Sequence, residues 1–201
     1  MIRKVGILKV RLDHFGFLAP FYERFISATM SEQLADLLDV PDNGVVLDAA
    51  GGTGRIAQFL CAGAAQIVVV DESRRMLREA NRKPGIDPVC SHIEQLPFQD
   101  NSFDRILMVD ALHHLANQQR ASLELWRLLK PGGRIVIEEP DVRTFAVKLI
   151  AVAEKVALMR SHFLDPVRIA GLFPSKDACV SIKTDGPTAW VTIENRKRQP
   201  P

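Results

Sequence analysis

The 201-residue sequence contains few of the features that define several large protein classes. It has only three cysteines, Cys61, Cys90 and Cys179, which are far apart and form no Cys-x-x-Cys pair; this argues against a disulfide framework and favours a reducing compartment. Each lies in an apolar stretch and is expected to be a small buried hydrophobe. No uninterrupted apolar run reaches the about 18 residues of a membrane span, and charges from Lys9 to Asp13 break the N-terminal segment before a secretory apolar core could form. We therefore expect a cytoplasmic protein without a membrane span.

The sequence also lacks a large excess of charge. Lys and Arg number 26 against 24 Asp and Glu, a formal net charge of +2, so no strong field would attract nucleic acid or anionic lipid. One basic cluster, Arg196–Arg198, lies in a terminal segment and is interpreted as a solvated end. The length suits one hydrophobic core, so we expect a single domain. The sequence does not indicate an oligomeric state.

What the sequence does contain is a regular alternation of strand and helix patterns. Strands are expected at 45–47, 66–70, 88–91, 103–109 and 134–138, and helices at 54–62, 72–81 and 118–129. Strands that alternate with helices form a parallel sheet with right-handed crossovers. Outside this region, helices are expected after Pro20, over 142–162 and from 165, and residues 130–133 are expected to break the helix before them.

Two alternating segments, 178–184 and 188–194, end the pattern. Only Asp185, Gly186 and Pro187 separate them, which predicts an antiparallel hairpin. The fold class is therefore α/β: a doubly wound, Rossmann-like sheet that is mostly parallel, with one antiparallel strand supplied by the C-terminal hairpin.

A glycine-rich turn follows the first predicted strand, with the sequence Asp-Ala-Ala-Gly-Gly-Thr-Gly at 48–54. Glycines let the backbone approach a ligand closely, and the first turn of such a sheet is the usual ligand site. Asp71 ends the second strand, at the distance where these folds bind ribose hydroxyls. The pattern alone is weakly specific, because Gly52–Ala57 also fits a dinucleotide fingerprint, and a tight turn beside an ordinary surface Asp stays open.

Four segments together resemble the class I S-adenosylmethionine-dependent methyltransferases, small-molecule branch, and particularly the ubiquinone/menaquinone methyltransferases. They run in that family's order through residues 45–139, about half of the chain. The segments are Val45–Gly54, Val70–Ser73 with Met76-Leu77, Leu96–Asp104 and Leu128–Gly133. The resemblance implies a seven-stranded sheet of order 3-2-1-4-5-7-6 and S-adenosyl-L-methionine as cofactor, with S-adenosyl-L-homocysteine as product.

The resemblance also implies a role for each matching residue. Asp48 would organise the turn and reach the methionine amino group, with the backbone of 50–52 along the methionine moiety. Asp71 would hold the ribose. One departure concerns His92, which stands where the family often has an Asp that accepts from the adenine amino group; a His accepts there only through an unprotonated nitrogen. The full cofactor set implied is Asp48, Ala49, Ala50, Gly51, Gly52, Gly54, Asp71, Glu72, Met76, His92, Ile93, Glu94 and Asp110.

Candidates for methyl-transfer chemistry follow the fourth strand, where the sequence Leu-His-His-Leu at 112–115 resembles a common family pattern. Transfer is an in-line displacement, and a base must reach any proton that the acceptor loses. His113 and Asp110 are the catalytic candidates; a structural His and a helix-capping Asp are the alternatives. His113 and His114 point in different directions, so at most one easily faces the substrate. Adjacent histidines lack helical metal-ligand spacing, so no metal is expected.

The remaining segments are expected to determine the acceptor. We divide the chain into an N-terminal arm and helix (1–43), a cofactor-binding core (44–139), helices expected to cover the substrate (140–175) and the hairpin (176–195). Glu139 and Asp141, at the end of the fifth strand, are read as a rim of the site, although simple solvation explains them nearly as well. The predicted function is methyl transfer to a small-molecule acceptor. The alternatives are a nicotinamide-dependent oxidoreductase and a catalytically silent cofactor-binding module.

Overall fold

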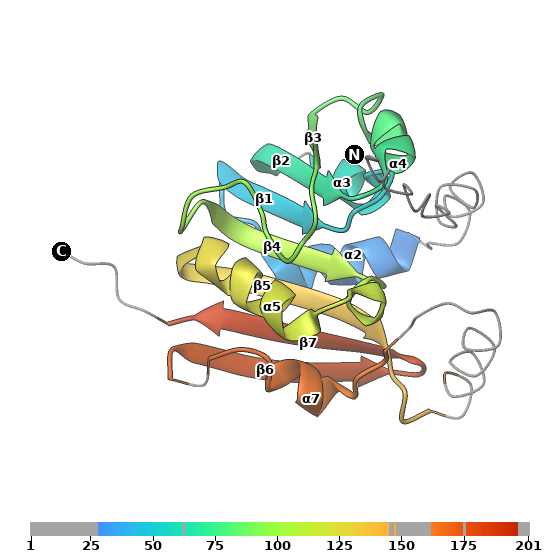
Figure 1. Ribbon diagram of the computed structural model, residues 1–201, viewed down its shortest axis with the longest axis vertical. Coiled ribbons are helices and arrows are strands. Elements are labelled where there is room, and N and C mark those ends of the chain that lie inside the picture. The colour runs from blue at the N-terminus through green and yellow to red at the C-terminus, as the bar shows by residue number, and fades with distance from the viewer. Residues whose placement is uncertain (1–27, 62, 145–146, 148–161, 175, 197–201) are drawn as a thin grey trace, which may run out of the picture.

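The computed structural model describes residues 28–61, 63–144, 147, 162–174 and 176–196, and its centre is one seven-stranded sheet (Figure 1). The strand order is β3-β2-β1-β4-β5-β7-β6, as predicted. All neighbouring pairs are parallel except β5–β7 and β7–β6, so β7 is the one antiparallel strand. The strands are β1 Gly44–Ala49, β2 Ala64–Asp71, β3 Ile86–Cys90, β4 Phe103–Val109, β5 Leu129–Pro140, β6 Ala178–Asp185 and β7 Thr188–Asn195.

The described helices begin and end where the local sequence provides caps. Ser73 caps one helix by accepting from the Met76 amide, and Asn117 and Asp165 accept from the first-turn amides of two others. Asp165 is followed by a proline at the first helical position, which has no amide hydrogen to satisfy. The helices are α2 Ala28–Leu38, α3 Arg55–Leu60, α4 Arg74–Ala80, the 3-10 turn η1 Leu112–His114, α5 Gln118–Leu128 and α7 Pro166–Ala170.

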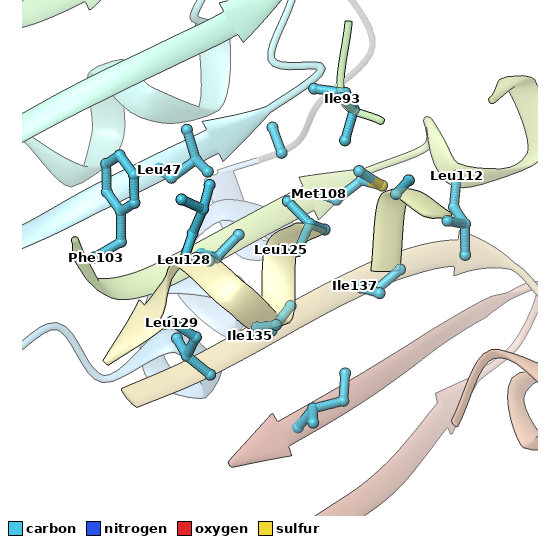
Figure 2. Close-up of a cluster of buried hydrophobic side chains, with 14 of the residues drawn as sticks. Leu47, Ile93, Phe103, Met108, Leu112, Leu125, Leu128, Leu129, Ile135 and Ile137 are labelled. Atoms are coloured by element: carbon cyan, nitrogen blue, oxygen red, sulfur yellow. The ribbon is translucent and has the colours of Figure 1, made fainter. Parts of the chain in front are cut away.

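Helices cover both faces of the sheet, which explains why the central strands are nearly continuous runs of apolar residues. In Figure 1, α5 lies in front of the sheet and α2 behind it. The front cluster packs α5 and α7 against strand residues such as Leu47, Met108 and Ile137, several of which are labelled in Figure 2. The rear cluster packs α2, α3 and α4 against the alternate strand residues, including Val46 and Leu107. Both clusters hold the carboxyl ends of β1, β2 and β4 in fixed positions.

The junction between α5 and β5 differs from the expectation in one respect. The helix ends at Leu128, and Leu129, predicted as its last residue, begins the strand that was expected only from Arg134. Phe103 pairs with Leu129 and Arg105 pairs with Arg134, so residues 130–133 form an irregularity inside β5. A side chain at Gly133 would lie 2.7 Å from Leu129 Cδ1, which is why glycine is needed there. Residues 130–133 were expected to separate the helix from the strand, but they form an irregular segment within β5.

The cysteines are less buried than expected. Cys90 is exposed and Cys61 and Cys179 are partly exposed, and all three are free thiols. The expectation of small buried hydrophobes is wrong for Cys90, at the end of the edge strand β3, and only partly met by Cys61, which packs against the rear cluster, and by Cys179 in the edge strand β6.

Some expectations fall on residues outside those the structure describes. These include the N-terminal arm, the first part of the helix after Pro20, and most of the helical segment expected over 142–162. The division of the chain into four parts therefore remains a prediction. Among the residues that are described, no helix has both the length and the apolar character needed to cross a membrane.

Candidate functional site

A cavity of about 250 Å³ opens at the carboxyl ends of the parallel strands, at the point where the strand order reverses. Its walls come from the turns after β1, β2, β3 and β4. Of the predicted cofactor residues, all but Ala49 and Gly54 line it. The wall residues are Asp48, Ala50–Thr53, Arg55, Ile56, Asp71–Ser73, Met76, Ser91–Glu94, Val109–Ala111 and His114–Ala116.

The glycine turn and Asp71 form one hydrogen-bonded unit. The Gly52 amide donates to Asp71 Oδ2 at 3.0 Å, and the Ser73 amide donates to Asp71 Oδ1 at 2.8 Å. Gly52 has φ +56°, a conformation that a side chain would strain. The acid at the end of β2 thus fixes the turn after β1, while its carboxylate borders the cavity. The two motifs, which the sequence assigns to one ligand site, border the same cavity, and the hydrogen bond between them is a finding of the structure.

Asp48 lies at the inner end of the cavity and is 1% exposed. Its Oδ2 is buried without a hydrogen-bond partner among the described residues. Burial raises the pKa of this carboxyl to about 7, and repulsion from Asp71 adds to the rise; a backbone hydrogen bond from Ala57 opposes it. A side chain at Gly51 would lie 2.4 Å from the Asp48 carboxyl, so bare backbone is required beside it. An unsatisfied buried carboxylate beside open backbone suits a ligand that brings N–H donors and positive charge.

The opposite end of the cavity lies between β2 and β3. His92 Nδ1 is 3.1 Å from Glu72 Oε2, and both side chains are largely exposed. Met76 and Ile93 are buried and supply an apolar surface. The end that the resemblance assigns to adenine therefore has apolar packing and a polar His–Glu pair in place of a single acid.

The turn after β4 distinguishes the two adjacent histidines. His114 lines the cavity. His113 does not line it, and the His113 side chain is only 2% exposed. His113 Nδ1 is 2.6 Å from Glu139 Oε2, and its ring stacks on Phe163 with centroids 4.2 Å apart. The sequence reasoning chose His113 as the catalytic candidate, but the structure brings its neighbour to the cavity wall. The sequence could not show which of the two histidines faces the cavity, because adjacent residues differ only in the direction in which their side chains point.

Asp110, the other catalytic candidate, does border the cavity. Its φ of +52° is unusual for a residue with a side chain, and its amide donates to the Glu138 carbonyl at 2.9 Å. This strained conformation places Asp110 at the entrance to the η1 turn, with its carboxylate about half exposed. The structure therefore supports its position in the site.

Sequence reasoning gave too little weight to the end of β5. Glu139 and Asp141 are 4% and 3% exposed, so the alternative of a solvated rim is wrong for both. Glu139 Oε1 accepts from the amides of Ala111 and Leu112, at 2.9 and 2.7 Å. The available signal was the position of two acids directly after a buried strand that neighbours the site.

The charges around the cavity favour a cationic ligand. Among the described residues, the acids Asp48, Asp71, Glu72, Glu94 and Asp110 line it, against the single cation Arg55. His114 adds no charge near neutral pH, since burial and repulsion from His113 lower its pKa to about 4. The described residues include no group of three metal-ligating side chains, and the expected absence of a metal stays a prediction.

Comparison with known proteins is consistent with this geometry. Residues 47–137 match the family described as "Methyltransferase domain". The chain is similar to a demethylmenaquinone methyltransferase of Paenarthrobacter aurescens, 36% identical over 53% of the chain and 42% of that protein. It is also similar to a mitochondrial 2-methoxy-6-polyprenyl-1,4-benzoquinol methylase of Caenorhabditis elegans, 30% identical over 79% of the chain and 63% of that protein. The chain thus spans about two fifths to two thirds of these relatives.

A solved structure shows the same fold. It is an S-adenosylmethionine-dependent methyltransferase from Thermotoga maritima, 24% identical, which aligns with a TM-score of 0.75 over 90% of the chain and 98% of that structure. At this identity the match concerns the arrangement of strands and helices.

Proposed function

We propose that the protein transfers a methyl group from S-adenosylmethionine to a small-molecule acceptor, because residues 47–137 match the methyltransferase domain family. The observation that carries this proposal is the buried Asp48 carboxylate: its Oδ2 has no hydrogen-bond partner in the described part of the chain and lies beside bare glycine backbone in the cavity. The ammonium group of the methionine moiety would supply both the positive charge and the donors that this oxygen lacks.

The remaining wall residues would each contact a different part of the cofactor. Asp71 is the group for the ribose, because its carboxylate borders the cavity and a carboxylate can accept from both ribose hydroxyls. Met76 and Ile93 would contact the faces of the adenine, with the His92–Glu72 pair at its polar edge. These contacts would orient the sulfonium toward the turn after β4.

When bound, the cofactor supplies an electrophilic methyl group. The protein contributes position: the walls hold donor and acceptor in line, and such alignment lowers a barrier by on the order of 7–11 kcal/mol. The five acids around the cavity stabilise the positive charge of the donor, and His114, neutral near pH 7, does not oppose it. No covalent intermediate with a side chain is required.

The acceptor would occupy the part of the cavity nearest the turn after β4. That wall combines the apolar residues Val109, Ala111, Leu115 and Ala116 with the polar ring of His114. Such a surface suits a neutral, largely apolar small molecule. The two similar proteins are named for demethylmenaquinone and a benzoquinol, so soluble quinols are the first acceptors to test. An acidic cavity also disfavours nucleic acid.

We further propose a cytoplasmic location, because all three cysteines are free thiols.

One observation favours a second candidate, a module that binds the cofactor without transferring its methyl group. His92 and Glu72 form an exposed pair where the resemblance leads us to expect an Asp. If that pair weakens adenine binding, the protein could retain the product complex and lack turnover.

Two measurements test the proposal. Calorimetric titration should show binding of S-adenosylhomocysteine and no binding of NAD. Incubation with methyl-labelled S-adenosylmethionine and a panel of short-chain demethylmenaquinol and benzoquinol analogues should transfer label to at least one compound. Binding without transfer to any acceptor would favour the silent module, and preferential binding of NAD would contradict both.

A further inference from the structure

Glu139 is the acceptor for three hydrogen bonds from one short stretch of chain. Oε1 accepts from the amides of Ala111 and Leu112, and Oε2 lies 2.6 Å from His113 Nδ1. All three donors belong to the turn that continues directly into His114 and Leu115 at the cavity wall. The side chain is 4% exposed, so water cannot substitute for these contacts.

His113 extends this contact to the opposite side of the turn. Its ring stacks on Phe163 with an interplanar angle of 14°, and its carbonyl accepts from the His162 amide at 2.7 Å. Gln118 Nε2 donates to the carbonyls of both Leu112 and His162. The turn is thus held from β5 by Glu139 and from the 162–163 segment by a stacked ring and backbone contacts.

We propose that Glu139 and His113 are a positioning pair for methyl transfer, which rests on the proposed function: Glu139 fixes the turn so that His114, and not His113, faces the acceptor. Neither side chain of the pair lines the cavity. The pair acts on the acceptor wall, while the groups assigned to the cofactor, Asp48 and Asp71, belong to other strands. Loss of the pair should therefore impair turnover and leave cofactor affinity intact.

The chemistry of the pair predicts a specific response to Glu139→Gln. The amide oxygen of glutamine can still accept from Ala111 and Leu112, but its NH₂ group would face His113 Nδ1. His113 must then switch to the tautomer protonated at Nε2, the nitrogen 4.0 Å from Asp110 Oδ1. The turn would shift slightly without unfolding. Glu139→Ala would remove all three contacts.

The chain provides a matched control in the neighbouring residue. Glu138 is 5% exposed, lies in the same strand and is also hydrogen bonded, but its partner is Trp190 Nε1 at 2.6 Å on the rear face of the sheet. Glu138→Gln removes an equally buried carboxylate and leaves in place the contacts of Glu139 to the Ala111 and Leu112 amides and to the His113 ring. It separates a positioning role from a general effect of losing a buried charge.

The experiment compares wild type, Glu139→Gln, Glu139→Ala and Glu138→Gln. For the acceptor identified in the quinol panel, kcat should fall by about tenfold in Glu139→Gln and by up to about a hundredfold in Glu139→Ala, as expected when a reacting group is misplaced by an ångström or less. S-adenosylhomocysteine affinity should be unchanged in all variants that retain a cooperative thermal transition. Glu138→Gln should keep the wild-type kcat.

The loss of kcat at unchanged S-adenosylhomocysteine affinity is the readout that a merely structural role would not produce, and nitrogen-15 NMR of the His113 ring checks the contact to Glu139 itself. The NMR spectrum should show a proton on Nδ1 in the wild type and Glu138→Gln, and on Nε2 in Glu139→Gln. An unchanged kcat in Glu139→Gln, an equal loss in Glu138→Gln, or an unchanged tautomer would overturn the inference. If the wild type binds no S-adenosylhomocysteine, the proposed function fails. In that case the NMR signals of the Ala111 and Leu112 amides still test the positioning pair. If Glu139 fixes the turn, these signals shift in Glu139→Gln and not in Glu138→Gln.

Discussion

Asp71 Oδ2 and the backbone nitrogen of Gly52 lie 3.0 Å apart, so the acid that ends β2 holds the turn that follows β1. Replacing Asp71 by Ala would remove this contact together with the proposed ribose contact. We expect weaker binding of S-adenosylhomocysteine by at least the roughly 1.5–3 kcal/mol of a charged hydrogen bond. Calorimetry on the folded variant measures the loss, and unchanged affinity would show that the ribose is bound elsewhere.

Gly51→Ala should abolish cofactor binding through a steric conflict. The added carbon would lie 2.4 Å from the Asp48 carboxyl, which is buried and cannot move into solvent. Overpacking of this kind costs about 1–3 kcal/mol of stability. Gly63→Ala is the control, because nothing lies within 4 Å of the added carbon there. Thermal melts and titrations on both variants test the difference; a Gly51→Ala variant that binds normally would contradict the tight approach of the turn.

Cofactor binding should release a proton from Asp48. Burial raises the pKa of this carboxyl from 3.8 to about 7, so the free protein carries it largely protonated below pH 7. An ammonium group would require the charged form, so affinity should increase with pH up to about pH 7 and then level off. Calorimetry at pH 6 in buffers of different ionisation enthalpy measures the released proton.

Asp48→Asn is the control for that release. It should remove the proton release, weaken binding, and increase the unfolding free energy at pH 8, where the wild type must bury a charge. The sign follows from linkage: between pH 3.8 and about 7 the folded state holds a proton that the unfolded state has lost, so wild-type stability decreases as pH rises. Proton release that persists in Asp48→Asn would assign it to another group.

His114 should titrate with a pKa near 4. Burial is the main cause, and repulsion from His113 adds to it. Because the unfolded state binds a proton between about pH 4 and 6.5 that the folded state does not, this residue should make stability increase with pH across that window. NMR titration of the ring checks the pKa, and a flatter pH dependence in His114→Gln checks the linkage. An ordinary pKa near 6.5 would place the ring in solvent and not on the cavity wall.

The residue patterns by themselves determined the fold class, and they predicted that the glycine turn and Asp71 belong to one ligand site. Alternation of β-branched strands with amphipathic helices predicts a parallel sheet, and the hairpin at Asp185–Pro187 predicts its antiparallel member. The glycine turn and Asp71 could be paired from their spacing because the ends of neighbouring parallel strands must meet at one edge. These features depend on local patterns and on chain connectivity, which the sequence states directly.

Only the tertiary structure decided which histidine faces the cavity and which contacts the acids at the carboxyl end of β5 make. His113 and His114 are chemically identical, and their roles differ because Glu139, 26 residues away in sequence, accepts from one of them. The raised pKa of Asp48 likewise depends on how completely α3 and the turn exclude water from it. Burial and long-range hydrogen bonds arise from packing between distant segments, and a single sequence carries no local signal for them.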